Sequence, residues 1–393
     1  MLKDFSPQAM VMGLLVAFVG FISSFAVIMQ GLTAMGAQPD EVASALLVLS
    51  VLMGLLGILL PLWRRMPISC AWSTPGAALL ANVGAIEGGF SAAVGAFLLC
   101  AVLIILSGLF SPLGRAMRKI PASLANAMLA GILLGLCLAP VKAVAFNPWL
   151  GLPIVGAWMI VLMWKRLWAV PAALGAFVLV LVFGVDLPPD LMSQLAGSIH
   201  PTLVPVIPTF TWHAFISIAV PLFIVTMASQ NIPGIAILKV YGYEPPAGPL
   251  FVATGIFSAI GALFGAVPVN LAAITAAMCA SEEAHPDPKR RYWAAIIGGV
   301  GYILLGLLAS AIIAFVALSP PILLQAVAGL ALIGAFSNSA QAAFRDAASR
   351  EAAAVTFLVT ASGTAFLGVS GAFWGVVAGM AMLGLLKFVR FSA

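Results

Sequence analysis

The chain has 393 residues, of which 63% are hydrophobic and 7% charged, and its formal net charge is +5. No soluble core could bury so much apolar surface, so the composition excludes a water-soluble globular protein and predicts a polytopic membrane protein. The start, Met1-Leu2-Lys3-Asp4, lacks the apolar stretch and cleavage site of a removable signal peptide, so we expect the first span to stay in the membrane.

Hydropathy and charge together divide the chain into about fourteen apolar segments, each close to the ~20 residues that span a bilayer. In chain order these segments are 7–35, 42–62, 66–87, 90–111, 120–140, 144–164, 167–186, 212–236, 248–265, 267–282, 292–317, 319–337, 352–367 and 369–386. We therefore predict an all-α polytopic membrane protein with a first seven-span repeat at 1–190, an outer linker at 191–211 and a second seven-span repeat at 212–393.

The 17 Lys and Arg residues test this division, because cytoplasmic loops carry an excess of positive charge. All of them except Lys142 lie at the two termini or in loops that follow an even-numbered span. This asymmetry predicts that both termini are cytoplasmic, provided that segments 66–87 and 267–282 each count as one crossing. The net charge therefore reflects topology and indicates no nucleic-acid surface.

The two halves are expected to form an inverted repeat, because an odd number of spans makes the second half enter from the opposite side. Inverted repeats of this kind are typical of secondary transporters. An alignment of the halves sets 67–69 on 268–270, Ala71 on Ala272 and Thr74 on Thr275. Because the identity is weak, the prediction rests mainly on topology.

The third segment begins with RMPISCAWSTPG, an unusual sequence for a transmembrane helix. Pro67 and Pro75 each lack a backbone donor, and the residue before a proline favours extended geometry. We therefore predict extended chain at 67–72, with Thr74 capping a half-helix whose first position is Pro75. The alternative is that both prolines kink an otherwise packed helix.

The tenth segment predicts the same arrangement from the other side. Residues 267–270 are expected to be extended, with Asn270 as the cap of a half-helix at 271–280, or Thr275 as the cap if the alignment holds. Irregular backbone at membrane depth is tolerated only where protein or a water-filled cavity covers it. Two helix N-termini near the midplane offer N–H groups and positive dipole ends, so we expect a negatively charged ligand.

Three stretches resemble the BenE family of bacterial benzoate/proton symporters: MPISCAWSTPGAALL at 66–80, Phe5-Ser6, and NLAAITAA at 270–277. The resemblance covers essentially the whole chain, and AWSTPG at 71–76 is its most specific part. It implies proton-coupled import of benzoate or a similar aromatic carboxylate across the bacterial inner membrane. A distant relation to the uracil and sulfate transporter superfamily implies a core domain, about 5–113 and 212–317, that moves against a gate domain, about 118–190 and 319–390.

Polar side chains in the first and eighth segments are candidate ligands, although interhelical hydrogen bonding is the alternative role for each. A helix would set Thr226, Ser229 and Gln230 on one face. Nucleobase-transporting relatives carry an acidic residue there, and a neutral donor suits an anionic substrate better. Ser24 is preferred over Ser23 and Gln30, and Trp72, Phe25 and Phe264 are candidate walls for the ring. The predicted substrate-binding residues are Ser24, Trp72, Ser73, Thr74, Gly76, Thr226, Ser229, Gln230, Asn270 and Leu271.

Proton coupling has weaker sequence support, because all twelve Asp and Glu lie at span ends or in loops. The best titratable candidates are Glu87, Glu282 and Glu283, which close the two half-helices. The substrate could instead carry its own proton as the neutral acid. Symport with protons therefore rests on the family resemblance alone.

The sequence contains no nucleophile elbow, phosphate-binding loop or metal-ligand cluster, so we expect neither an enzyme nor a cofactor or metal site. The four cysteines lie in apolar stretches and are expected to be buried thiols. The expected partners are the substrate, protons and lipid, and a homodimer is left open. The alternatives within transport are another small anion or a nucleobase as substrate, or a passive anion channel.

Overall fold

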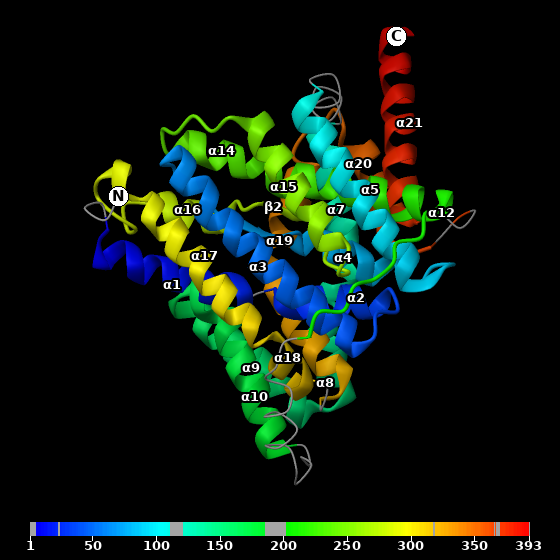
Figure 1. The fold of residues 1–393 in the computed structure, drawn as a ribbon. Helices are drawn as coiled ribbons and strands as arrows, with labels where there is room; N and C mark the ends of the chain where they lie inside the picture. Colours follow the sequence, from blue (N-terminus) through cyan, green and yellow to red (C-terminus); the bar gives the residue numbers. More distant parts are fainter. Residues whose placement is uncertain are drawn as a thin grey trace.

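The computed structural model describes residues 5–22, 24–110, 121–184, 202–316, 319–364, 366 and 370–392, which are mostly helical (Figure 1). The first half contains α1 (Pro7–Ile22), α2 (Phe25–Ala34), α3 (Pro39–Arg64), α4 (Thr74–Val83), α5 (Gly89–Leu109), α7 (Ala122–Cys137), α8 (Ala139–Phe146), α9 (Pro148–Trp164) and α10 (Ala169–Gly184). The second half contains α12 (Trp212–Ala214), α13 (Val220–Thr226), α14 (Ile232–Val240), α15 (Ala247–Ala262), α16 (Ile274–Ala280), α17 (Tyr292–Leu307), α18 (Ala309–Val316), α19 (Pro321–Phe344), α20 (Arg350–Ala361) and α21 (Gly371–Ser392). The predicted helical fold class is confirmed.

Six helical stretches in the described part of the chain are long and apolar enough to cross a membrane. A seventh counts if α17 and α18, which are bent by 53° at their junction, form one span. The shorter apolar helices are α9, α10, α15 and the first part of α21. The multi-pass architecture is therefore supported, and the number of fourteen crossings stays a prediction.

The first predicted segment agrees with a candidate span at Pro7–Ala34, within which α1 ends before Ser24 and α2 begins after it. The boundary before the sixth segment lies at Asn147, whose side chain caps α9 by accepting a hydrogen bond from the Trp149 N–H at 3.0 Å. Ser23 and residues 191–201 of the predicted linker lie outside the described residues.

Two short strands, β1 (Cys70–Trp72) and β2 (Val269–Leu271), form the sheet in the described chain, and Figure 1 shows β2 near the centre of the molecule. They pair antiparallel with Ala71 opposite Asn270. Two flanking bonds extend the ladder, from Ser73 N–H to Pro268 O at 3.0 Å and from Ala272 N–H to Ser69 O at 2.9 Å. The prolines prevent helix here, and each extended segment satisfies the backbone of the other. This register is consistent with the alignment of the halves, in which Cys70 and its strand partner Leu271 are equivalent positions.

The helices pack in two groups. In the first group α1 and α3 pack on α17, α5 packs on α15, and α2 packs on α4. In the second group α7 packs on α19 and α20, α20 packs on α21, and α9 packs on α10. Contacts between α4 and α7 connect the two groups beside the paired strands.

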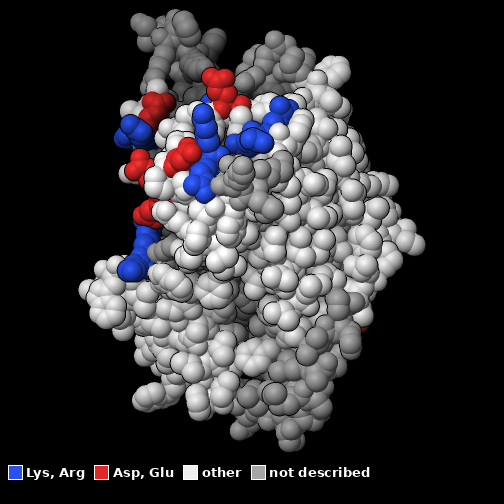
Figure 2. Space-filling model, turned by 60° about the vertical axis from the view of Figure 1, so that its left-hand side comes forward, with Lys and Arg blue, Asp and Glu red and all other residues white. Residues whose placement is uncertain are grey.

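Charged side chains gather at one end of the face shown in Figure 2, and a broad uncharged surface extends from there over the rest of that face. Large apolar side chains are also exposed on α9 and α10, among them Trp149, Trp164 and Phe183. Exposed apolar surface of this extent fits contact with lipid.

Candidate functional site

The first half-helix starts one residue earlier than the sequence predicted. Thr74 is the first residue of α4, Pro75 the second, and Ser73 occupies the N-cap position without a capping hydrogen bond from its side chain. The Ser73 hydroxyl instead shares a hydrogen bond with Thr226 Oγ1 at 2.7 Å, which ties α4 to α13. Because Pro75 has no N–H, the donors left at this helix start are the backbone groups of Thr74 and Gly76.

The second half-helix starts later than predicted, at Ile274, and Asn270 does not cap it. Asn270 is fully buried in β2. With its amide oriented so that both polar atoms have partners, its oxygen accepts from the Ser73 N–H at 2.9 Å. Leu271 also lies in β2, and its N–H donates to Asn231 Oδ1 at 2.9 Å. Both residues belong to strand β2, so the helix begins only after them. The sequence pattern did not reveal this pairing.

A small cavity of about 90 Å³ lies between the two half-helix starts. Four of the predicted substrate-binding residues line it, namely Ser24, Trp72, Thr74 and Gln230. The other lining residues are Val19, Gly20, Met53, Ala71, Ala272, Ala273, Ile274, Thr275 and Tyr302. The structure therefore brings together side chains from α1, α3, α4, α16 and α17 with the turn at Met227–Asn231.

Trp72 forms a fixed aromatic wall of this cavity. Its indole N–H donates to Ser24 Oγ at 2.7 Å, and the Ser24 hydroxyl donates to Gly20 O at 2.9 Å. The ring packs on Phe21 with 5.2 Å between centroids, and Phe21 stacks on Phe25. The break after α1 makes room for this arrangement, since Ser24 departs from helical geometry with φ −142°. Phe25 contributes behind the wall, and Phe264 does not line the cavity.

Tyr302 and Thr275 supply hydroxyl groups to the cavity, and the sequence analysis missed this role for both. Thr275 Oγ1 shares a hydrogen bond with Ser69 Oγ at 2.7 Å. Tyr302 is buried, and its hydroxyl lies against Gly20, where an added Cβ would come within 2.0 Å of it. The only sequence signal is a tyrosine in the Gly-rich stretch 298–302, a composition that is also typical of close helix packing.

Thr226, Ser229 and Gln230 do not share one helix face, contrary to the prediction. Residues Met227–Asn231 form a π-helical turn, which inserts an extra residue per turn and changes which side chains align. Gln230 lines the cavity, whereas Ser229 donates to Val225 O at 2.5 Å and Thr226 binds Ser73.

Gly76 is required for close packing behind the cavity. A Cβ at Gly76 would lie 2.5 Å from Leu222 Cδ1 and 2.6 Å from Ser73 Oγ. A side chain here would therefore displace the Leu222 side chain and the Ser73 hydroxyl, and so disturb the Ser73–Thr226 hydrogen bond.

The acidic candidates lie away from this cavity. Glu87 follows α4 and lines a different cavity, and Glu282 and Glu283 follow α16. The Glu283 carbonyl accepts a hydrogen bond from Gln8 Nε2 at 3.0 Å. No charged side chain is among the residues that line the central cavity, and the described residues contain no group of three His, Cys, Asp or Glu that could hold a metal.

The far end of α16 is held by Arg291, which is buried although charged. Its guanidinium donates to Ala280 O and His285 O, each at 2.7 Å, and to Pro286 O at 3.3 Å. A cation at the C-terminal end of a helix is favourable because the dipole is negative there. In the same loop region, burial raises the pKa of the Tyr243 phenol, and the nearby Arg291 partly offsets that rise.

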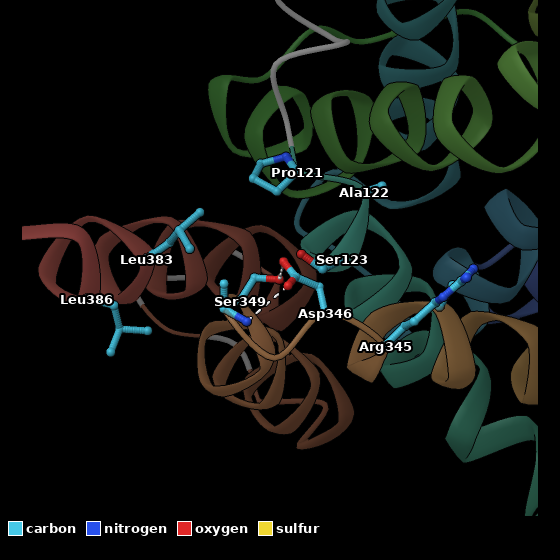
Figure 3. A pocket seen from close by; sticks show the side chains of 10 residues that line it. Pro121, Ala122, Ser123, Arg345, Asp346, Ser349, Leu383 and Leu386 are labelled. Carbon is cyan, nitrogen blue, oxygen red and sulfur yellow. Dashed lines mark hydrogen bonds between the residues drawn. The ribbon is translucent and has the colours of Figure 1, made fainter. Parts of the chain in front are cut away.

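A larger cavity of about 620 Å³ lies elsewhere, between the start of α7, the ends of α19 and α21, and the start of α20 (Figure 3). Its Asp346 carboxylate accepts from the Ser349 hydroxyl at 2.9 Å and from the Ala348 N–H at 3.0 Å. It contains no predicted substrate-binding residue, and its lining carries the opposite charges of Arg345 and Asp346. We therefore place the candidate site at the central cavity.

Comparisons with known proteins agree on a transport family. Residues 3–385 match the family model BenE, described as benzoate membrane transport protein. The Escherichia coli protein named inner membrane protein YdcO is 40% identical over 375 residues, which cover 95% of this chain and 94% of that protein. The Acinetobacter baylyi protein named benzoate membrane transport protein is 32% identical over 394 residues, covering 96% and 95%.

Solved structures share the fold at low sequence identity. The murine Slc26a9 anion transporter in its inward-facing state is 14% identical, with a TM-score of 0.65 over 97% of this chain and 68% of that one. The transmembrane domain of the cyanobacterial bicarbonate transporter BicA is also 14% identical, with a TM-score of 0.59 over 96% and 98%. At this identity the likeness supports the predicted transporter fold of seven-plus-seven inverted repeats, and it does not identify a substrate.

Proposed function

The chain belongs to the BenE family of benzoate membrane transport proteins, and we propose from this premise that it imports benzoate or a similar aromatic carboxylate together with protons. The transporter would lie in the bacterial inner membrane with both termini in the cytoplasm. The observation that carries the proposal is the central cavity, where two half-helix starts meet among neutral hydroxyl and amide groups.

The start of α4 is suited to hold the carboxylate. The N–H groups of Thr74 and Gly76 have no partner within the helix, and the positive end of the helix dipole adds to their attraction for an anion. The start of α16 faces the same cavity and contributes less, because this helix has only seven residues. The hydroxyl group of Thr74 is a further donor.

The rest of the cavity is suited to a single aromatic ring. Trp72 lines one part of it, and Val19 and Met53 add apolar surface. The volume of about 90 Å³ is below the ~150 Å³ of a cavity that holds one benzene ring, so even a small one-ring acid needs some movement of the walls and a larger one needs more. This argument favours benzoate-like acids over larger anions.

Transport would follow if the group that carries the cavity moves against the other group. We assign the core domain to about 5–113 and 212–317 and the gate domain to about 118–190 and 319–390. The packing of α1, α3, α5, α15 and α17 with one another, and of α7, α19, α20 and α21 with one another, supports this assignment. The α4–α7 contact is then the boundary along which the domains slide.

The proton would travel separately from the bound carboxylate. The central cavity is lined by no carboxylate or imidazole that could carry a proton, so the relay groups would lie outside it. Glu87, Glu282 and Glu283 lie at the ends of the half-helices and remain candidate relay groups.

Uptake by proteoliposomes tests the proposal. We would measure radiolabelled benzoate uptake driven by an inward proton gradient, with protein-free vesicles as the control because the neutral acid crosses lipid unaided. The key variant is Gln230→Glu, which keeps the side-chain shape and places a carboxylate in the cavity. Like-charge repulsion of about 1.4 kcal/mol or more would weaken benzoate binding at least about tenfold.

Gln8→Glu is the matched control, because Gln8 is exposed and its side chain donates to the Glu283 carbonyl, away from the central cavity. Full benzoate uptake by Gln230→Glu would contradict anion binding at this cavity. Gradient-independent uptake without saturation would instead indicate a passive anion channel.

A further inference from the structure

Three hydroxyl groups that line the central cavity are already hydrogen-bonded within the protein, so a ligand would have to compete for them. They are those of Ser24, Thr275 and Tyr302, which bond to Trp72 and Gly20 O, to Ser69 Oγ and to Val16 O respectively. Two polar side chains of the lining have no hydrogen-bond partner in the described part of the chain, Thr74 and Gln230. These two are the side chains that the cavity offers to a substrate.

Gln230 is carried by a turn that hydrogen bonds hold in place on both sides. Just before the turn, Thr226 Oγ1 shares a hydrogen bond with Ser73 Oγ at 2.7 Å, next to the start of α4. At the end of the turn, Asn231 Oδ1 accepts from the backbone of β2 at 2.9 Å. The turn itself is π-helical, and such turns are frequent at functional sites. A fixed support therefore presents the half-buried Gln230 amide to the cavity.

Thr74 and Gln230 are offset along the cavity. Thr74 is the first residue of α4, where the proposed function places the carboxylate. Gln230 follows Thr226 by four residues, or about 6 Å along a helix axis, and shares the lining with Ala272 and Ala273 before α16. This offset is comparable to the length of a benzene ring. A ring whose carboxylate binds at the start of α4 can therefore reach Gln230 with its opposite end.

We propose that the Gln230 amide recognises a hydroxyl group at the para position of the ring, so that para-hydroxybenzoate and similar acids are preferred to unsubstituted benzoate; the inference rests on the proposed function. The amide oxygen accepts from the phenol hydroxyl, or the amide N–H donates to the phenol oxygen. An acid that fills the cavity without a polar group at this position removes water from the amide and leaves it unpaired. Gln230 thus determines specificity, and the start of α4 binds the carboxylate that all these acids share.

Competition between two acids of equal size tests the inference. We would compare para-hydroxybenzoate with para-methylbenzoate, which has the same number of heavy atoms, as inhibitors of radiolabelled benzoate uptake by wild-type proteoliposomes. We expect the hydroxy acid to inhibit at an about tenfold lower concentration, the factor that one hydrogen bond to an otherwise unpaired group gives. Equal inhibition would overturn the inference and would indicate that Gln230 binds the carboxylate together with Thr74.

Gln230→Met removes the amide and keeps the length of the side chain. We expect the preference for the hydroxy acid to disappear in this variant, because the phenol hydroxyl then faces an apolar wall. Ser229→Ala is the matched control, since Ser229 is adjacent, donates to Val225 O and lies outside the lining. This control should keep the wild-type preference, whereas an unchanged preference in Gln230→Met would overturn the inference.

The ratio of the two inhibitory concentrations separates recognition from a structural role, because a change in folding or turnover alters both inhibitors alike. If Gln230→Met does not transport, the ratio is measured by displacement of radiolabelled para-hydroxybenzoate from purified protein in detergent. Wild-type benzoate uptake reports on the proposed function separately: uptake with equal inhibition rejects only the hydroxyl preference. Absence of uptake rejects the proposed function, and the displacement ratio then still decides the role of Gln230.

Discussion

Gly20→Ala provides the most direct test of the central cavity, because the change adds one carbon atom at a known place. The new Cβ would lie 2.0 Å from Tyr302 Oη, 3.1 Å from Tyr302 Cζ and 3.4 Å from Thr275 Cγ2. Ordinary contacts between heavy atoms need roughly 3.5 Å, so the tyrosine or the helices must move by about 1.5 Å. Tyr302 is buried and has little space to move.

The size of the effect follows from the cost of overpacking, which is about 1–3 kcal/mol. If the displaced tyrosine enters the cavity, benzoate affinity should fall by about 5- to 150-fold. The assay is the concentration dependence of benzoate uptake in proteoliposomes, with Gly175→Ala as the control. Gly175 lies on α10 with nothing within 4 Å of an added Cβ, so this variant should transport like wild type.

The double variant Gly20→Ala/Tyr302→Phe tests the mechanism. Removing the hydroxyl leaves 3.1 Å as the closest approach, which a small shift relieves. We therefore expect the double variant to recover most of the affinity relative to Tyr302→Phe alone, as in a double-mutant cycle for residues in contact. Two results would refute the steric argument. One is a benzoate affinity of Gly20→Ala equal to that of Gly175→Ala. The other is a double variant whose loss of affinity is no smaller than the product of the losses in the two single variants.

Three further predictions concern the framework of the site. Asn231→Leu should lower the free energy of unfolding by about 1–3 kcal/mol, because the buried Leu271 N–H loses its acceptor; thermal unfolding in detergent measures this, and an unchanged midpoint would contradict it. Arg291→Met should lower the free energy of unfolding by about 3 kcal/mol, because three backbone carbonyls lose their donor. Arg290→Met, which removes one hydrogen bond to the Phe5 carbonyl, should lower it by less than about 1 kcal/mol in the same assay. Trp72→Phe removes the hydrogen bond to Ser24 and should weaken benzoate binding about 3- to 10-fold in uptake assays; unchanged binding would show that the wall needs no fixed orientation.

The sequence alone was sufficient for the architecture, because lipid imposes simple rules on composition and on charge. Apolar segments separated by Lys and Arg predicted a multi-pass helical protein, and Pro67 with Pro75 predicted extended chain before a half-helix. The family followed from the motif at 71–76, and the family model confirms it. Trp72 and Thr74 were singled out from this motif, and both line the central cavity.

Only the tertiary structure decided how the two broken segments meet. The sequence predicted extended chain at 267–270, but the antiparallel pairing of Ala71 with Asn270 depends on contacts between residues far apart in sequence, so no local pattern could reveal which residues pair. The π-helical turn at Met227–Asn231 likewise reassigned Thr226 and Ser229 to packing contacts. Composition and charge determine which segments enter the membrane, because each segment exchanges water for lipid by itself. The side chains that share a cavity are determined by long-range pairing and packing, which act only once the chain has folded.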